Sequence, residues 1–134
     1  MVIIVDSSVW IDYFNGNSTA ESDFLDRILG IQDIAVGDLI LTEVLQGFRS
    51  DKDYKTAKSI VGDFDVVEML GRERSISAAS KYRNLRKTGI TVRKTNDVII
   101  ASYCIDEKIP LLFSDKDFEP FVKDLGLLTA IRGI

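Results

Sequence analysis

The chain has 134 residues, no histidine and one cysteine, and its 17 basic and 21 acidic residues give a formal charge of −4. This length predicts one domain, residues 1–134, and a composition of 46% hydrophobic and 28% charged residues predicts a chain that buries its own core. The lack of histidine excludes imidazole-based triads, histidine zinc sites and two-histidine ribonuclease chemistry, and the single cysteine excludes an internal disulfide.

Short apolar runs alternate along the chain with segments of helical periodicity. The strand candidates are continuous apolar runs, and the helix candidates carry apolar residues at spacings of three and four. The predicted strands span 2–5, 34–36, 64–67 and 109–113. The predicted helices span 9–14, 19–29, 39–48, 51–61, 75–87, 95–103 and 118–125. This alternation predicts an α/β fold with a parallel sheet.

The cellular setting follows from features that the sequence lacks. No apolar run approaches the roughly 18 residues that cross a bilayer, and the first residues lack the basic and apolar regions of a signal peptide. We therefore expect a cytoplasmic protein with no membrane partner.

The charge is unevenly distributed along the chain, since residues 1–67 carry 12 acids and 5 bases whereas residues 68–134 carry 9 acids and 12 bases. This asymmetry is compatible with a bound polyanion.

Acidic and hydroxyl side chains follow the first and the last predicted strands. Asp6 and Ser7 come directly after the first strand, and Ser114, Asp115 and Asp117 follow the last. Ligands of parallel α/β sheets bind beyond the carboxyl ends of the strands, so we expect these side chains to meet at one edge. Two carboxylates at that edge are a candidate metal site.

Two further acids lie in the first turns of apolar helices. Glu43 and Asp97 are each surrounded in sequence by aliphatic residues, and a carboxylate buried there is costly unless a cation meets it. Together with Asp6 and Asp115 they offer the oxygen ligands that Mg²⁺ and Mn²⁺ prefer. Such a site supports hydrolysis of a phosphodiester by activated water without any histidine.

Each acid also has a purely structural interpretation. Asp6 and Asp117 are well placed as helix caps, Glu43 is a candidate ion-pair partner of Arg49, and the charge of Asp97 favours the helix dipole. Position by position the structural role is the simpler one. The four acids taken together favour a cation.

Four segments that contain these acids resemble, in order and spacing, the acidic motifs of the PIN domain. The segments are VDSSVWI at 5–11, LTEVLQGF at 41–48, NDVIIA at 96–101 and LFSDKDF at 112–118. The chain resembles in particular the VapC toxins of VapBC toxin–antitoxin systems, and YRNLRKTG at 82–89 is similar to that family's helix and turn. The resemblance spans nearly the whole chain.

This resemblance implies a Rossmann-like three-layer α/β/α sandwich with a central parallel sheet. It implies a Mg²⁺- or Mn²⁺-dependent endoribonuclease that forms a homodimer and is inhibited by a VapB-type antitoxin. The residues implied to bind metal and to act in catalysis are Asp6, Glu43, Asp97 and Asp115. The polar residues expected beside them are Ser7, Ser114 and Asp117. Ser114 stands where the family usually has threonine, and it keeps the hydroxyl.

Six bases and no acid lie between residues 81 and 96, ending one residue before Asp97. We expect phosphates of the RNA to bind Arg86, Arg93 and Lys94, whereas Lys81 and Lys87 equally fit a solvated helix face.

An aromatic set is concentrated on the first predicted helix. Trp10, Tyr13 and Phe14 are expected to lie mostly in the core, and any exposed members would offer a groove for an antitoxin segment.

Three alternatives from other classes share parts of this pattern. A haloacid-dehalogenase-type phosphatase requires a second aspartate two residues after the first, and Ser8 occupies that position. A phosphoacceptor receiver domain places a lysine after its last strand, but Lys116 here lies between two aspartates. The remaining alternative is a non-catalytic PIN-like domain that binds RNA or protein.

Overall fold

The computed structural model describes residues 1–131 and contains one parallel sheet with the strand order β3-β2-β1-β4. The strands are β1 (Val2–Val5), β2 (Asp33–Gly37), β3 (Asp65–Val67) and β4 (Leu111–Leu112). The helices are α1 (Ser7–Phe14), α2 (Ala20–Ile28), α3 (Asp38–Gln46), α4 (Asp51–Val61), α5 (Arg72–Lys87), α6 (Thr95–Glu107), α7 (Glu119–Leu125) and the short 3-10 helix η1 (Lys116–Phe118).

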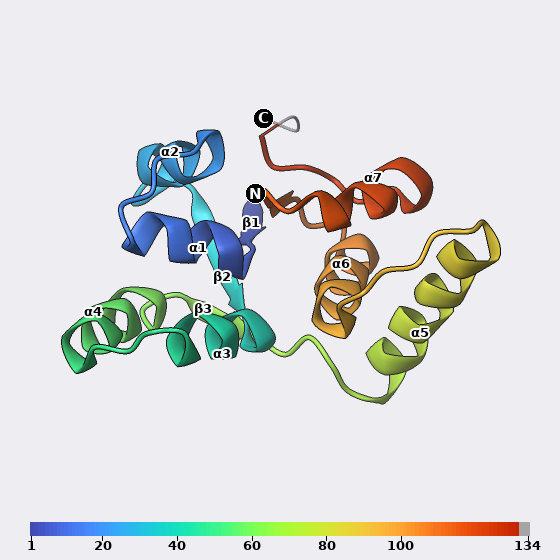
Figure 1. Cartoon of the computed structure of the whole chain (residues 1–134), viewed down its shortest axis with the longest axis horizontal. Helices are drawn as coiled ribbons and strands as arrows, with labels where there is room; N and C mark the ends of the chain where they lie inside the picture. Colours follow the sequence, from blue (N-terminus) through green and yellow to red (C-terminus); the bar gives the residue numbers. More distant parts are fainter. Residues whose placement is uncertain (132–134) are drawn as a thin grey trace.

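Helices flank the sheet on both sides. In Figure 1, α1, α2 and α4 lie on one side of the strands, and α5, α6 and α7 lie on the other. The predicted α/β fold with a parallel sheet is therefore confirmed. None of the helices within residues 1–131 is long and apolar enough to cross a membrane.

Strand β1 is central in the sheet and buried on both faces. Ile3, Ile4 and Val5 have no exposed surface, because helices cover both faces of the sheet and β2 and β4 flank the strand. A continuous β-branched run is the pattern expected of such a strand. Its carboxyl end delivers the next residue, Asp6, to the point where α1 begins.

Several predicted boundaries are corrected: α5 begins at Arg72 rather than 75, α6 ends at Glu107 rather than 103, and two others lie next to the site. The last strand comprises only Leu111–Leu112 rather than 109–113, and Pro110 contributes its carbonyl, which accepts from the Ile4 N–H at 3.0 Å. Because proline has no N–H to donate, regular pairing begins after it. The first helix begins at Ser7 rather than Val9, since Asp6 caps it and accepts from the Ser8 N–H.

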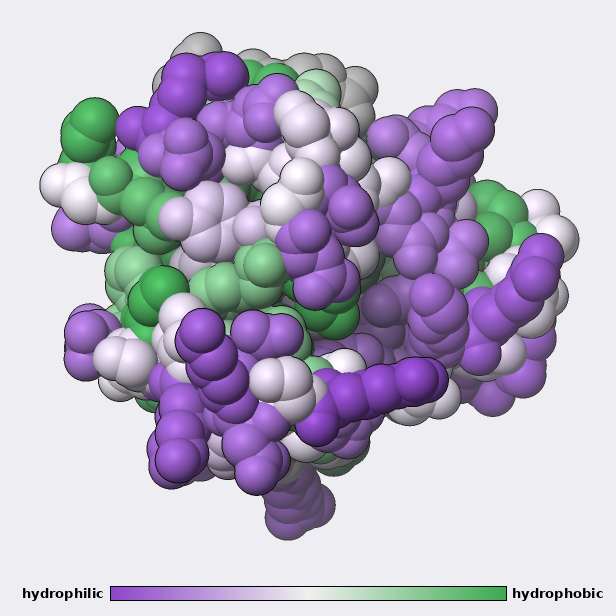
Figure 2. Space-filling view, turned by 60° about the vertical axis from the view of Figure 1, so that its left-hand side comes forward, coloured by the Kyte–Doolittle hydropathy of each residue, from purple (hydrophilic) through white to green (hydrophobic). Residues whose placement is uncertain are grey.

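The aromatic set on α1 is largely internal. Trp10 has no exposed surface, stacks on Phe14 with ring centroids 5.8 Å apart and contacts Phe64 at the same separation. Phe14 also meets Phe48 edge to face. Figure 2 shows pale and green side chains in a band between more hydrophilic ones on this side of the molecule. Trp10 is thus a core residue that offers no surface to a partner, whereas Tyr13 and Phe14 are half-buried.

Gly37 joins β2 to α3 at a place with no room for a side chain. A Cβ there would overlap the Met69 thioether, which is 1% exposed. We expect Gly37→Ala to lower the free energy of unfolding by about 1–3 kcal/mol, measured by urea denaturation. Gly47→Ala, at the other end of α3, is the control, because its Cβ would lie at an ordinary 3.6 Å from backbone oxygens. An equal loss for Gly37→Ala in a Met69→Ala background would contradict this explanation.

Candidate metal centre

Four acids from four elements meet at the carboxyl end of the sheet. Asp6 follows β1 and caps α1, and Asp115 follows β4 and caps η1. Glu43 lies within α3, and Asp97 lies in the first turn of α6. The parallel sheet and the helices that leave its edge therefore bring together the acids that the sequence singled out.

Asp6 is buried and only half satisfied. It is 3% exposed, and its Oδ2 accepts from the Ser8 hydroxyl at 2.8 Å and from the Ser8 N–H at 3.4 Å. Its Oδ1 is buried and meets no donor in the described part of the chain. Burial raises the pKa of Asp6 more than the hydrogen bonds from Ser8 lower it, and the charge of Glu43 raises it further.

Asp97 shows the same imbalance. It is 6% exposed, and its Oδ2 has no donor among residues 1–131. Burial, followed by the nearby charge of Asp6, raises its pKa from 3.8 to about 7. A buried carboxylate that is repelled by another carboxylate favours any cation that can reach both.

Asp115 already has partners. Its Oδ1 accepts from the Asp117 N–H at 2.9 Å, and its Oδ2 accepts from the Lys94 ammonium at 3.2 Å. The bond from the Asp117 N–H lowers the pKa of Asp115, and Lys94 lowers it further. The interpretation of Asp117 as a helix cap is therefore wrong, because Asp115 is the residue that caps η1. Asp117 instead adds its carboxylate to the cluster, with one oxygen each from Asp97, Asp115 and Asp117 all within 4.8 Å of one another.

Glu43 is held by polar neighbours. The Ser7 hydroxyl donates to its Oε1 at 3.1 Å, and the Asn96 amide lies 3.5 Å from its Oε2. The ion pair between Glu43 and Arg49 that the sequence suggested is not formed among the described residues. Ser7 therefore orients Glu43.

Two hydroxyls complete the rim. The oxygens of Ser8 and Ser114 lie 3.4 Å apart, so Ser8, which also bonds Asp6, links the end of β1 to the loop that follows β4. The sequence reasoning missed Ser8 and Asn96. Only their positions in the sequence could have indicated a role at the site: Ser8 lies two residues after a capping aspartate, and Asn96 directly precedes Asp97.

The residues present fit a hard divalent cation. The donor set consists of carboxylate oxygens, two of which are buried without a hydrogen-bond donor in the part of the chain that is described. Oxygen ligands of this kind suit Mg²⁺ and Mn²⁺. The only ammonium paired with these acids within residues 1–131 is that of Lys94, which reaches Asp115 and leaves Asp6 and Asp97 unpaired.

The basic residues divide into different environments. Lys81 forms an ion pair with Asp106 at 2.7 Å and also bonds Ser77 and Ser102, which gives it a structural role between α5 and α6. Lys94 lies at the acidic cluster, as its position beside Asp97 predicted. Arg86 lies over the Tyr82 ring, 5.5 Å from its centroid.

The raised pKa of Asp97 makes a prediction about stability. Between pH 3.8 and about 7 the folded chain holds a proton that the unfolded chain has lost, so the free energy of unfolding falls as the pH rises through this window. We expect Asp97→Asn to be more stable than the native chain at pH 8, by on the order of 2 kcal/mol, and similar to it at pH 4. Urea denaturation without divalent cations at both pH values measures this.

Asp115→Asn is the matched control, with the opposite sign. The pKa of Asp115 is lowered, so its charge stabilises the fold above pH 4 and that contribution is lost on acidification. This variant should be less stable than the native chain at pH 8. Equal behaviour of the two variants would contradict the charge distribution described here.

The chain is similar to known proteins over nearly its whole length. The chain is 28% identical over 131 residues to the VapC ribonuclease Mb1587 of Mycobacterium bovis, and equally to the ribonuclease VapC11 of Mycobacterium tuberculosis. Each alignment covers 96% of this chain and 98% of the relative.

Two solved structures share the fold at low sequence identity. One is VapBC2 from Rickettsia felis bound to a DNA fragment from its promoter, with a TM-score of 0.75, 16% identity and coverage of 96% of this chain and 97% of that one. The other is a toxin–antitoxin complex from Klebsiella pneumoniae, with a TM-score of 0.70, 14% identity and coverage of 95% and 96%. The family profile described as PIN domain matches residues 3–122, and the chain therefore belongs to the PIN domain family.

Proposed function

We propose that this protein is a Mg²⁺- or Mn²⁺-dependent endoribonuclease of the VapC type, the toxin of a type II toxin–antitoxin system that acts in the cytoplasm. The observation that carries the proposal is the cluster of carboxylates at the carboxyl end of the sheet, in which Asp6 and Asp97 each keep a buried oxygen without a donor among residues 1–131. The similarity to ribonucleases named VapC over 96% of the chain supports the same function.

In this proposal Asp6, Glu43, Asp97 and Asp115 hold the cation, and Asp117 lies beside them. When bound, the cation activates a water and offsets negative charge on the phosphate under attack. The Ser8 hydroxyl fixes Asp6, and the Ser7 hydroxyl fixes Glu43. Ser114 completes the polar rim next to Ser8.

Three basic side chains serve the RNA backbone in this proposal. They are Arg86, Arg93 and Lys94. Lys94 is closest to the acids, so it is placed to contact a phosphate near the cleaved bond. Contacts of this kind provide affinity that does not depend on sequence and that falls with salt.

Cleavage of RNA should require both the divalent cation and the acids. We expect the purified chain to hydrolyse RNA in Mg²⁺ or Mn²⁺ and to stop in EDTA. Asp6→Asn, Asp97→Asn and Asp115→Asn should each lower the cleavage rate at least about 100-fold, since even partners outside the metal shell commonly cost 10–100-fold. Gel analysis of total RNA and transfer RNA measures this.

Asp106→Asn is the control, because Asp106 lies on the same helix as Asp97 and pairs with Lys81 away from the cluster. Equal cleavage in EDTA would contradict the metal mechanism. No cleavage of any RNA would favour the non-catalytic binding domain instead.

We further propose a VapB-type antitoxin as partner and a homodimer as the assembled form. The two structural relatives are toxin–antitoxin systems by their descriptions. The contact of Lys94 with Asp115 indicates that this cluster accommodates an ammonium group. An antitoxin that inserts a lysine or arginine among the acids would therefore displace the metal, while its own acids meet Arg86, Arg93 or Lys94.

This mode of inhibition makes a kinetic prediction. The concentration of the cognate antitoxin that halves cleavage should rise with the concentration of Mg²⁺, and alanine in place of the inserted basic residue should weaken inhibition. Cleavage assays across a series of Mg²⁺ concentrations measure both effects. Inhibition that is independent of Mg²⁺ would contradict displacement and favour blockage of the RNA path.

A further inference from the structure

A cavity of about 570 Å³ lies between α5 and α6, outside the acidic cluster. One wall is formed by one face of α5, from Ser75 to Arg86. The other wall is formed by the loop before α6 and by the first two turns of α6. The lining residues that matter here are Tyr82, Arg83, Arg86, Val92, Arg93 and Val98. This volume lies in the range of sites that hold one small ligand.

The lining is cationic and apolar. Arg83, Arg86 and Arg93 contribute three positive charges, and the cavity has no acidic lining residue. None of these arginines forms an ion pair within residues 1–131. Val92 and Val98 are buried and form an apolar floor, and the half-buried Tyr82 adds an aromatic ring. Unpaired cations above an apolar and aromatic surface suit a ligand that combines a negative charge with a flat ring.

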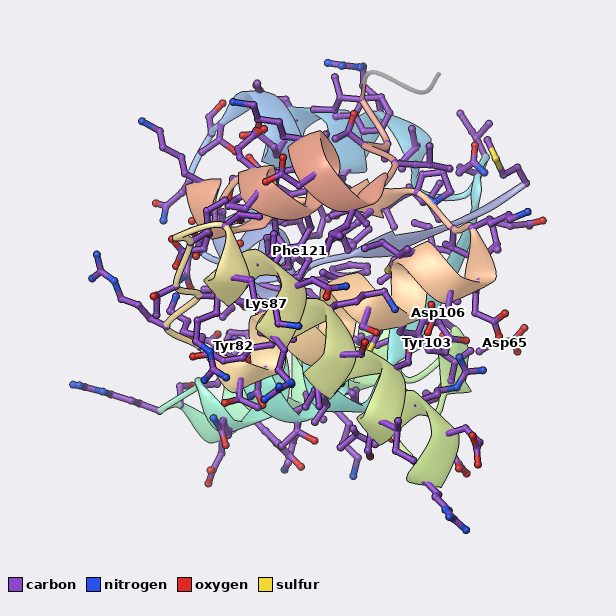
Figure 3. All side chains as sticks on the ribbon, turned by 90° about the vertical axis from the view of Figure 1, so that its right-hand side faces the viewer. Asp65, Tyr82, Lys87, Tyr103, Asp106 and Phe121 are labelled. Carbon is purple, nitrogen blue, oxygen red and sulfur yellow. The ribbon has the colours of Figure 1, made fainter. Side chains whose placement is uncertain are left out.

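The cavity adjoins the acidic cluster through α6. Thr95 and Val98, on the first turn of that helix, line the cavity, and Asp97 lies between them in sequence. Arg93 lines the cavity while the next residue, Lys94, reaches Asp115. Figure 3 shows α5 crossing α6. In this view Tyr82 is well separated from Asp106, which lies near the C-terminal end of α6, away from the turns that line the cavity. This adjacency allows an RNA chain with one phosphate at the acids to place a neighbouring nucleotide at the cavity.

We propose that this cavity is a nucleotide subsite in which the base next to the cleaved phosphate lies against Tyr82 and the apolar floor, with its phosphate at Arg83. This inference rests on the proposed ribonuclease function and deepens it, because it adds contact with a base to contact with the backbone. A base subsite makes cleavage depend on the nucleotide at one position.

A second copy of the chain fits this cavity less well. A two-fold interface centred on it would bring the same three arginines of both copies together, and like charges facing each other disfavour association.

The test uses fluorescence anisotropy of labelled single-stranded hexaribonucleotides in Mg²⁺, with the Asp97→Asn background to prevent cleavage. The variants are Tyr82→Leu, which keeps apolar packing but removes the ring, and Arg83→Gln, which removes an exposed charge. The control is Lys87→Gln, because Lys87 is an exposed base on α5 that does not line the cavity. Thermal melts establish that each variant is folded.

We expect Tyr82→Leu and Arg83→Gln each to weaken binding about tenfold, and Lys87→Gln to change it less than about twofold. Arg83→Gln should also reduce the salt dependence of binding by about one phosphate contact. Replacing one nucleotide of the hexamer with an abasic residue should weaken its binding to the chain whose cavity residues are unchanged. The same replacement should have no further effect in Tyr82→Leu.

Three results would overturn the subsite. Cavity variants that bind and cleave the same RNAs as the native chain refute it while leaving the ribonuclease function intact. Additive effects of the abasic residue and Tyr82→Leu show that the base lies elsewhere. A change in oligomeric state by light scattering, with unchanged RNA binding, assigns the cavity to a second copy. A chain that binds RNA through the cavity but cleaves none refutes only the proposed function.

Discussion

The burial of carboxylates beside one another is the constraint on which this site depends, and the repulsion between them adds to its cost. Asp6 and Asp97 are nearly inaccessible, each has an oxygen without a hydrogen-bond donor in the described residues, and each raises the free energy of the other's charged form. Buried carboxylates without a cationic partner lower the free energy of unfolding of the chain. A divalent cation bound among these oxygens, as proposed above, would relieve this imbalance and would suit this edge of the sheet to chemistry on phosphates.

The scaffold tolerates this cluster because its centre is strongly apolar. Ile3, Ile4 and Val5 hold β1 in the middle of the sheet, and Trp10 fixes the helix that follows it. Asp6 and Asp115 follow strands and cap the helices that begin there, and Glu43 and Asp97 lie within helices, so their separation is set by rigid elements. Ser7 and Ser8 then orient two of the carboxylates through hydrogen bonds.

Local patterns were enough to predict the order of elements and the residues of the acidic cluster. The continuous β-branched run before Asp6 and the 3.6-residue apolar spacing around Glu43 and Asp97 are patterns that a single sequence displays. Asp117 was expected to cap the helix over 118–125, but the short helix η1 precedes that helix and Asp115 caps it, which depends on the backbone direction after β4. The cavity beside α6 was not predicted, since it depends on how α5 crosses α6.

The most direct test of the central claim is calorimetric titration of the chain with Mn²⁺ at pH 7.5, in two buffers that differ in their heat of ionisation. We expect the native chain to bind Mn²⁺ with release of protons, because Asp97 is partly protonated near that pH before a cation binds. Asp97→Asn should bind at least about tenfold more weakly and release fewer protons. Equal Mn²⁺ affinity in the native chain and in Asp97→Asn, or no binding by the native chain, would contradict the assignment of this cluster as a metal centre.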